Sequence, residues 1–221
     1  MKKINIIWLC LSILMIAGCS SSSEAKTKKE VAEASLSVEG KKILIAYFSW
    51  ADNTLVNDHD AMDLDATTSA SVLPPGNTAL IAKAIQKTKG GDIVSIQTQQ
   101  SYSIDYDECL DQASREKAED ARPALRTQVE HMDDYDIIFL RFPNWWSTCP
   151  MAIYTFLDSY DFNDKIIIPF VAHGTGGIGS SIRDLKDYLP NADFRDEFSI
   201  ERESMDQVEE RIAAWISEVL D

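Results

Sequence analysis

Unbroken apolar runs recur along this chain with helical segments between them, and this alternation limits the fold more than any other feature. Four runs are clear and a fifth is weaker: residues 43–48, 92–96, 137–140, 166–171 and about 194–200. Strands read as continuous apolar runs when helices cover both faces of a parallel sheet. The sequence therefore predicts an α/β domain built on five parallel strands.

The segments between these runs have the spacing of helices. From residue 78 to about 89, apolar residues recur on one helical face, and the glycines at 90 and 91 can end the helix. Further helices are predicted over 107–120, 123–132, 150–157, 180–189 and 205–220. The chain of 221 residues has room for one such domain with a sizeable core. We place this domain at residues 41–221.

The amino-terminal residues precede this domain and differ from it in composition. Two lysines come before an apolar run at 4–16. The run is shorter than the roughly 20 residues of a membrane-spanning helix, so it predicts a secretory signal. It leads to Cys19 through the tetrapeptide Ile-Ala-Gly-Cys, which resembles the signal of bacterial lipoproteins. We therefore predict a signal peptide over 1–18, a lipid on Cys19 and a flexible tether over 19–40, with a plain secretory signal or an uncleaved anchor as the alternatives.

The protein is acidic, with a formal net charge of −15 at pH 7. Such a surface repels the phosphates of nucleic acids and of anionic lipids. Nucleic acid is therefore excluded as a partner, and contact with the membrane is expected through the lipid on Cys19 alone. Beyond the signal, Cys109 and Cys149 remain. Their spacing forms neither a disulfide framework nor a metal motif, so no metal site is predicted, and whether they pair stays open.

The pair Asn-Thr occurs at 53–54 and again at 77–78, each time after a possible end of the first strand. A bound phosphate prefers the unpaired N–H groups and the positive dipole at the start of a helix. A helix is predicted to begin only at the second pair, and Gly76 before it can take a positive φ. An acid, Asp52, precedes the first pair and would repel a phosphate. The predicted phosphate site consists of Gly76, Asn77 and Thr78, with Ser49, Trp50 and Ala51 at the end of the first strand.

This assignment makes residues 52–74 an insertion that leaves the phosphate loop and returns to it. Neither half of the loop has a lysine or arginine next to it in the sequence. We therefore expect backbone dipoles alone to hold the phosphate. An acidic protein without a cation at this site also disfavours additional negative charge on the ligand.

Two more loops follow predicted strands at the same edge of the sheet. The third strand is followed by Pro143, Asn144, Trp145, Trp146 and Ser147. The fourth strand is followed by a glycine-rich segment, His173, Gly174, Thr175, Gly176 and Gly177. Indole rings can form a platform for a flat aromatic ligand, and glycines let the backbone approach it closely. One tryptophan is expected in the core and the other at the ligand, with either assignment open.

Together these motifs resemble those of the flavodoxin-like proteins, especially bacterial ones. The matching segments are Tyr47-Phe48-Ser49-Trp50 with Gly76-Asn77-Thr78, then Pro143-Asn144-Trp145-Trp146, then residues 173–181. The resemblance runs from about Lys42 to the end of the chain and implies a three-layer α/β sandwich with strand order 2-1-3-4-5. It also implies flavin mononucleotide (FMN) as cofactor, with the phosphate at the first loop and the isoalloxazine ring between the other two, a placement for which flavodoxin is itself a standard example. The 52–74 insertion departs from the compact phosphate loop of the family.

His173 is a weak candidate for a catalytic role. An imidazole can donate a proton near neutral pH, here to a reduced flavin or to a quinone. A purely structural hydrogen bond is the alternative for this side chain. Cys149, next to the aromatic loop, is either redox active or a small buried residue, and the second reading is favoured.

The resemblance implies a protein that uses FMN for electron transfer, either as a carrier or as a reductase. A lipid on Cys19 would hold it outside the cytoplasm, on the bacterial cell membrane. The redox partner, whether a quinone, NAD(P)H or an electron-transfer protein, is left open, and so is activity as an NAD(P)H:quinone-type oxidoreductase. The acidic site predicts a low reduction potential. The alternative function is a binding protein of the same fold that has lost flavin and recognises another phosphate-bearing or aromatic ligand.

Overall fold

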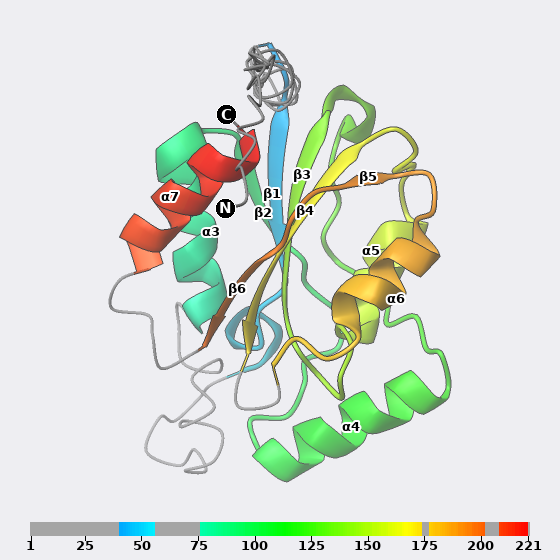
Figure 1. Ribbon diagram of the computed structural model, residues 1–221. Helices are drawn as coiled ribbons and strands as arrows, with labels where there is room; N and C mark the ends of the chain where they lie inside the picture. The colour runs from blue at the N-terminus through cyan, green and yellow to red at the C-terminus, as the bar shows by residue number, and fades with distance from the viewer. Residues whose placement is uncertain (1–39, 56–75, 174–176, 202–207, 221) are drawn as a thin grey trace, which may run out of the picture. The chain divides into compact units, whose positions relative to one another are not determined.

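One parallel sheet runs through the computed structural model, which describes residues 40–55, 76–173, 177–201 and 208–220 (Figure 1). Its strands are β1 (Ile43–Tyr47), β2 (Asp92–Ser95), β3 (Ile137–Pro143), β4 (Ile166–His173), β5 (Asp193–Phe194) and β6 (Phe198–Glu201). They lie in the order β2-β1-β3-β4-β5, and β6 also pairs with β4. The predicted parallel sheet with order 2-1-3-4-5 is confirmed.

Two short strands share the fifth position of the sheet. β4 pairs with β5 through Ile166 and Ile167, and with β6 from Phe170 onward. Between these pairings, the Arg195 amide donates to the Ile167 carbonyl at 3.0 Å. The polar residues 195–197 interrupt the apolar pattern at this point. The weak strand predicted near 194–200 is therefore two pieces on one path.

Helices cover both faces of the sheet (Figure 1). α3 (Gly76–Lys89) and α7 (Val208–Leu220) pack on one face, and α5 (Met151–Asp158) and α6 (Ser181–Tyr188) pack on the other. α4 (Tyr106–Ala118) lies toward the edge at which the strands end. Two 3₁₀ turns are also present, η1 (Ala51–Asn53) and η2 (Met132–Asp134). The predicted three-layer α/β sandwich is confirmed, and each of these α-helices lies within a few residues of its predicted range.

Alternate side chains of the central strand enter two separate cores. From β3, the core under α5 and α6 takes Ile138, Leu140 and Phe142. The core under α3 and α7 takes Ile137 and Phe139. Successive side chains of a strand point to opposite faces, so the position of any residue in β3 fixes the layer that it meets.

The helix predicted over residues 123–132 is wrong. Residues 123–129 form no helix and run back along the chain that follows β2, and the end of the segment is a turn that leads into η2. The Arg126 amide donates to the Gln97 carbonyl at 2.8 Å, and the Thr127 hydroxyl donates to the Ser95 carbonyl at 2.6 Å. β2 is an edge strand whose backbone groups would otherwise lack partners, and these bonds outweigh the weak helical preference of the segment.

The described residues all fall within one unit, Leu36–Asp221. The predicted signal peptide, the lipidation site Cys19 and the tether lie outside the described residues, as does most of the insertion. Among the helices of the described part, none has the length and apolar character needed to cross a bilayer. The lipid anchor stays a prediction.

Candidate functional site

The second Asn-Thr pair opens a helix, as predicted. α3 begins at Gly76, whose φ of +67° suits glycine. Thr78 is buried, Asn77 is half-buried, and the described first turn of α3 contains no acidic residue. α3 runs against the direction of the strands, so it starts at the edge where they end (Figure 1). Backbone N–H groups and the positive end of a helix dipole therefore meet at this edge.

The first Asn-Thr pair has a structural role instead. The Asn53 amide nitrogen donates to the carbonyls of Ser49 at 2.8 Å and Ile96 at 3.0 Å, and the Asn53 amide oxygen accepts from the Thr98 amide at 2.7 Å. The Thr54 hydroxyl donates to the Tyr102 carbonyl at 2.8 Å. This pair joins the ends of β1 and β2, so its polar atoms are already used by the protein.

The residues around this first pair also point into the protein. The Trp50 side chain is buried and its indole N–H donates to the Ser103 carbonyl at 3.1 Å, while Ala51 is buried at the start of η1. The Asp52 carboxylate accepts from the Ser95 hydroxyl at 2.6 Å. Trp50 and Ala51, which were predicted at the phosphate, can therefore offer it only backbone groups.

Ser49 is different from its neighbours. Its side chain is completely buried, and its hydroxyl has no hydrogen-bond partner within the described part of the chain. Phe48, whose amide continues the ladder from β1 to β3, belongs to the core under α5 and α6, so alternation places the next side chain, that of Ser49, on the face of α3. Buried hydroxyls are almost always hydrogen-bonded in native proteins. An unpaired one at the end of a central strand marks a place for a ligand.

Arg141 is a charged residue of this region that the sequence analysis missed. It lies in β3, where it pairs in register with Tyr47, and its side chain is completely buried. Its Nη1 donates to the Phe142 carbonyl at 3.2 Å, but Nε and Nη2 have no partner among the described residues. Burial lowers the pKa of the guanidinium to about 9, which still leaves it charged at neutral pH.

The signal for Arg141 was present in the sequence. The predicted third strand ended at residue 140, and Arg141 was given no role. The observed strand continues to Pro143, and it is buried at every position. An arginine flanked on both sides by apolar residues, next to a strand of this kind, is unusual because arginine is rarely buried without a partner.

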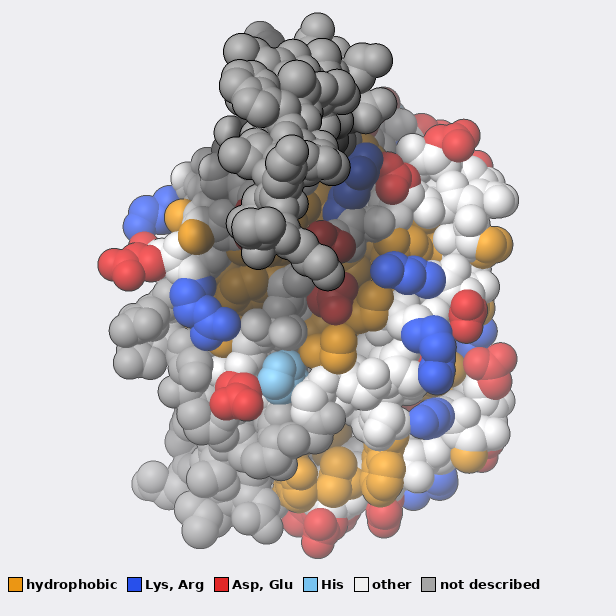
Figure 2. Space-filling view, in the orientation of Figure 1, with side chains coloured by type: hydrophobic (Ala, Val, Ile, Leu, Met, Phe, Trp, Pro, Cys, Tyr) orange, Lys and Arg blue, Asp and Glu red, His pale blue; other side chains and the backbone are white. Residues whose placement is uncertain are grey.

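The two tryptophans after β3 have separate roles. Trp145 is half-buried and packs edge-on against Phe48 and Tyr102, with ring centroids 5.4 and 5.1 Å away. Trp146 is 47% exposed, and its indole N–H donates to the Leu110 carbonyl of α4 at 3.0 Å. In Figure 2, hydrophobic side chains gather at the surface over α4. Trp145 is therefore the tryptophan that packs against the core, and the placement of the other tryptophan at a ligand stays a prediction.

Trp146 and Ser147 form the tip of a tight turn. The amides of Trp145 and Thr148 each donate to the carbonyl of the other, at 2.9 and 3.0 Å. Both residues between them have positive φ, 50° for Trp146 and 66° for Ser147. Turns of this geometry normally use asparagine and glycine, and each side chain in the left-handed region costs roughly 1 kcal/mol or more. The turn is therefore strained, and its surroundings must hold it.

The loop after β4 is one support of this turn. The Ser180 amide and hydroxyl both donate to the Ser147 carbonyl at 2.8 Å. A Cβ on Gly179 would lie 2.7 Å from the Ser147 backbone, so only glycine fits there. The Asn144 side chain donates to the Gly177 carbonyl at 2.7 Å. The predicted second and third loops are thus in direct contact.

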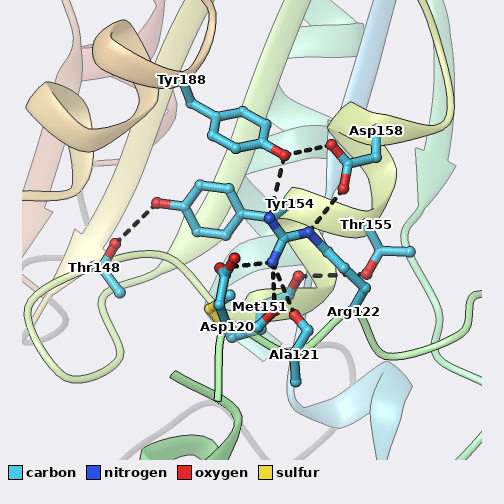
Figure 3. A network of polar contacts seen from close by, with 9 residues as sticks. All are labelled: Asp120, Ala121, Arg122, Thr148, Met151, Tyr154, Thr155, Asp158 and Tyr188. Atoms are coloured by element: carbon cyan, nitrogen blue, oxygen red, sulfur yellow. Dashed lines mark hydrogen bonds and ion pairs between the residues drawn. The ribbon is translucent and has the colours of Figure 1, made fainter. Parts of the chain in front are cut away.

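A second support comes from α4 and from the helices below the turn. Lys117 donates to the Trp146 carbonyl at 2.6 Å. The Thr148 and Tyr154 hydroxyls are 3.3 Å apart, and the Tyr154 ring packs edge-on against Tyr188 with centroids 4.9 Å apart (Figure 3). These contacts join the turn to α4, α5 and α6.

The structure describes some of the remaining predicted residues of these loops. Pro143 is the last residue of β3 and is buried. His173 ends β4 and is half-buried. Gly174, Thr175 and Gly176 lie outside the described residues. No group of three or more His, Cys, Asp or Glu residues that could hold a metal ion occurs in the described ranges.

Neither cysteine of the domain is poised for redox chemistry. Cys109 and Cys149 are both buried and are free thiols. Burial raises the pKa of each thiol to about 12. A thiol reacts as the thiolate, which such a pKa suppresses at neutral pH. The reading of Cys149 as a small buried residue is confirmed.

The sequence of this domain matches one protein family. A sequence model of the family named Flavodoxin matches residues 64–219. The chain belongs to the flavodoxin family. The match includes the start of α3, the turn after β3 and the loop after β4. The predicted family is confirmed.

Solved structures have the same fold. A candidate flavoprotein from Bacteroides eggerthii DSM 20697 is 27% identical with a TM-score of 0.61, and the match covers 81% of this chain and 98% of that one. For a candidate flavoprotein from Bacteroides uniformis ATCC 8492 the identity is 27%, the TM-score 0.61 and the coverage 80% and 99%. A flavoprotein from Lactobacillus acidophilus NCFM in complex with FMN is 16% identical with a TM-score of 0.53, covering 77% and 97%. The search of curated proteins found no match.

Proposed function

We propose that this protein binds FMN and carries electrons with it. The observation that carries the proposal is the buried, unpaired hydroxyl of Ser49, because it lies at the sheet edge where α3 begins. A phosphate at this edge would accept hydrogen bonds from the Ser49 hydroxyl and from the backbone amides at the start of α3. The Bacteroides neighbours are described as candidate flavoproteins, and the Lactobacillus acidophilus neighbour as a complex with FMN.

The residues of the three loops fit the parts of FMN. Ser49, Thr78 and the amides at the start of α3 would hold the phosphate. The turn at Trp146 and the loop at Gly177 would hold the isoalloxazine ring, since they combine aromatic surface with accessible backbone. When bound, flavin supplies one-electron and two-electron transfer. His173, at the end of β4, is the candidate to move a proton at this site.

FMN titration of the full-length protein tests the proposal. The protein should acquire flavin absorbance at about 450 nm, and its bound flavin should survive gel filtration. Thr78→Asp should lower FMN affinity by about tenfold or more, because it adds a negative charge at the helix start. Thr88→Asp, at the other end of α3, should leave affinity unchanged. A colourless wild-type protein would favour the alternative of a binding protein that has lost flavin.

Kinetics would separate a carrier from a reductase. A reductase should oxidise NADH or NADPH with a quinone or a dye as acceptor. A carrier should instead be reduced only by a partner protein and show no steady-state turnover. Replacing His173 by Gln should slow a two-electron reduction of quinone more than a one-electron reduction of dye, because only the quinone takes up protons.

We also propose that the protein is a lipoprotein outside the cytoplasm. Support for this comes from the sequence at Cys19, where the apolar run ends in Ile-Ala-Gly-Cys. Incorporation of a labelled fatty acid by the wild type, and its loss in Cys19→Ala, would test the anchor. Incorporation that persists in Cys19→Ala would rule it out.

A further inference from the structure

The guanidinium of Arg141 is a buried charge that the described protein leaves without a counter-ion. The residue is 0% exposed. Among the described residues, its polar contact is one bond to the Phe142 carbonyl, and its guanidinium lies 5.6 Å from the centre of the Phe170 ring. The donors Nε and Nη2, which form one side of the planar group, have no acceptor. A charge buried in this way is unfavourable unless an anion accompanies it.

Strand register places this charge next to the proposed phosphate site. Arg141 pairs with Tyr47 across β1 and β3, and the Phe48 amide donates to the Arg141 carbonyl at 2.8 Å. Arg141 and its register partner Tyr47 face the same side of the sheet, and Ser49 lies two residues beyond Tyr47, just after the end of β1, where the alternation continued through Phe48 turns it to that side as well. That face is the one covered by α3 and α7. The two residues with unpaired donors therefore lie near each other under the start of α3.

The electrostatics of this region also point to an anion. The start of α3 carries the positive end of the helix dipole, and its described first turn has no acid. The nearby carboxylate of Asp52 is directed to the Ser95 hydroxyl. Two positive features on one face would repel each other without an anion between them. The sheet edge thus combines a fixed cation, a helix start and a free hydroxyl.

We propose that Arg141 is the counter-ion of a phosphate monoester, which it binds through Nε and Nη2 while Ser49 donates its hydroxyl to the same group. The identification of that monoester as FMN rests on the proposed function. The Nε and Nη2 edge of a guanidinium matches two phosphate oxygens, which a lysine ammonium does not. This replaces the expectation from sequence that dipoles alone hold the phosphate. Arg141 is then the residue that selects phosphorylated over unphosphorylated flavin.

Comparing FMN with riboflavin isolates the phosphate. Full-length wild type should bind FMN more tightly than riboflavin. Arg141→Met should lose about 30-fold in FMN affinity, as expected when one partner of a buried charged contact is removed, with riboflavin affinity near the wild-type value. The FMN affinity of Arg141→Lys should lie between those of wild type and Arg141→Met. Lys165→Met is the matched control, because it removes another buried cation, which lies just before the amino end of β4 and so far from the edge where the strands end. It should leave the ratio of the two affinities unchanged.

The outcomes of this comparison are distinct. An FMN affinity in Arg141→Met equal to that of wild type would overturn the proposal. So would an equal loss for FMN and riboflavin, because it would mean that Arg141 supports the fold and not the phosphate. If wild type binds neither flavin, the proposed function fails. The proposal for Arg141 can then still be tested with inorganic phosphate. In that case phosphate should raise the melting temperature of wild type and not of Arg141→Met, and equal shifts or no shift would overturn the proposal.

NMR of the wild-type protein provides a test that does not depend on the folding of a variant. The Nε–Hε signal of Arg141 should shift on titration with FMN or inorganic phosphate. The signal of Arg122 should not shift, because its guanidinium is already bonded to Asp120 and Asp158. The proposal would be refuted if the amide signals of residues 76–78 shift while the Arg141 signal does not. It would also be refuted if neither set of signals shifts.

Discussion

Arg122 and Arg141 have opposite surroundings within one domain. Arg122 is half-buried and donates to Asp158 at 2.7 Å, to Asp120 at 2.8 Å and to Tyr188 at 3.2 Å (Figure 3). Tyr188 in turn donates to Asp158. Arg141 is buried and lacks a partner for two of its donors among the described residues. Each guanidinium nitrogen of the half-buried Arg122 has a partner in the protein, whereas two of those of the buried Arg141 do not.

This difference separates groups that hold the fold from groups that await a ligand. The Arg122 cluster joins the segment before β3 to α5 and α6, and the bonds within it are complete without any other molecule. At the carboxyl edge, Arg141 and Ser49 keep unpaired donors, and Trp146 and Ser147 keep a strained backbone. Unpaired buried groups and backbone strain lower stability, so they persist where a function needs them.

The largest effect is expected at Asn53, a fully bonded residue close to the unpaired Ser49. Asn53→Ala should destabilise the protein by about 3 kcal/mol, because it leaves the Ile96 and Ser49 carbonyls and the Thr98 amide unpaired in the interior. Asn77→Ala, in the second Asn-Thr pair, should cost less than about 1 kcal/mol. Urea unfolding of both variants measures the difference. An equal loss of stability in the two variants would contradict the view that the first Asn-Thr pair holds the fold and the second serves a ligand.

The contact between the turn and the glycine-rich loop should give the next largest effect. Gly179→Ala should cost about 2–3 kcal/mol, because its Cβ would lie 2.7 Å from the Ser147 backbone in addition to the unfavourable φ. Gly177→Ala has a similar φ of +64° with nothing within 4 Å of its Cβ, so it should cost only about 1 kcal/mol. Thermal unfolding can compare them. Similar melting temperatures for the two variants would mean that the close approach is not tight.

Sequence patterns predicted the parallel strands and the start of α3 because both depend on local and periodic features. The order of the strands followed instead from the resemblance to flavodoxin-like proteins. An apolar run specifies a buried parallel strand, and glycine before a helical stripe specifies the start of α3. The same reasoning failed for residues 123–132, where bonds to the end of β2 decide the conformation. Those bonds join segments about 30 residues apart, and no local pattern encodes them.

The candidate site, like the fold, was predicted in part from the sequence. Its three loops were predicted from motifs, but which of the two tryptophans packs against the core was left open. Arg141 was missed because the third strand was predicted to end at residue 140, and only the folded chain shows that two of its donors lack a partner. Likewise, only the folded chain shows that the Asn53 side chain is fully bonded and that the Ser49 hydroxyl is not.

A smaller effect with opposite signs should distinguish the two arginines directly. Without ligand, Arg141→Met should stabilise the protein by about 1–2 kcal/mol, because it removes an unpaired buried charge and keeps a similar volume. Arg122→Met should destabilise it by about 1 kcal/mol, since it leaves Asp158 and Tyr188 without their cation. Chemical denaturation in phosphate-free buffer measures both. Loss of stability in Arg141→Met would mean that the protein itself satisfies this arginine.

The smallest effect should come from relaxing the strained turn. Ser147→Gly should stabilise the protein by about 0.5 kcal/mol, because glycine accepts the φ of 66° and this gain exceeds its added entropy in the unfolded chain. Ser159→Gly, at a residue with φ of −82°, should instead destabilise the protein, since it adds entropy to the unfolded chain and removes the hydroxyl bond to the Thr155 carbonyl. The melting temperature of each variant relative to wild type measures the effect, and a lower value for Ser147→Gly would mean that the turn is not strained. If Ser147→Gly gains stability and also weakens FMN binding, the strain in this turn holds the backbone in the conformation that the ligand requires.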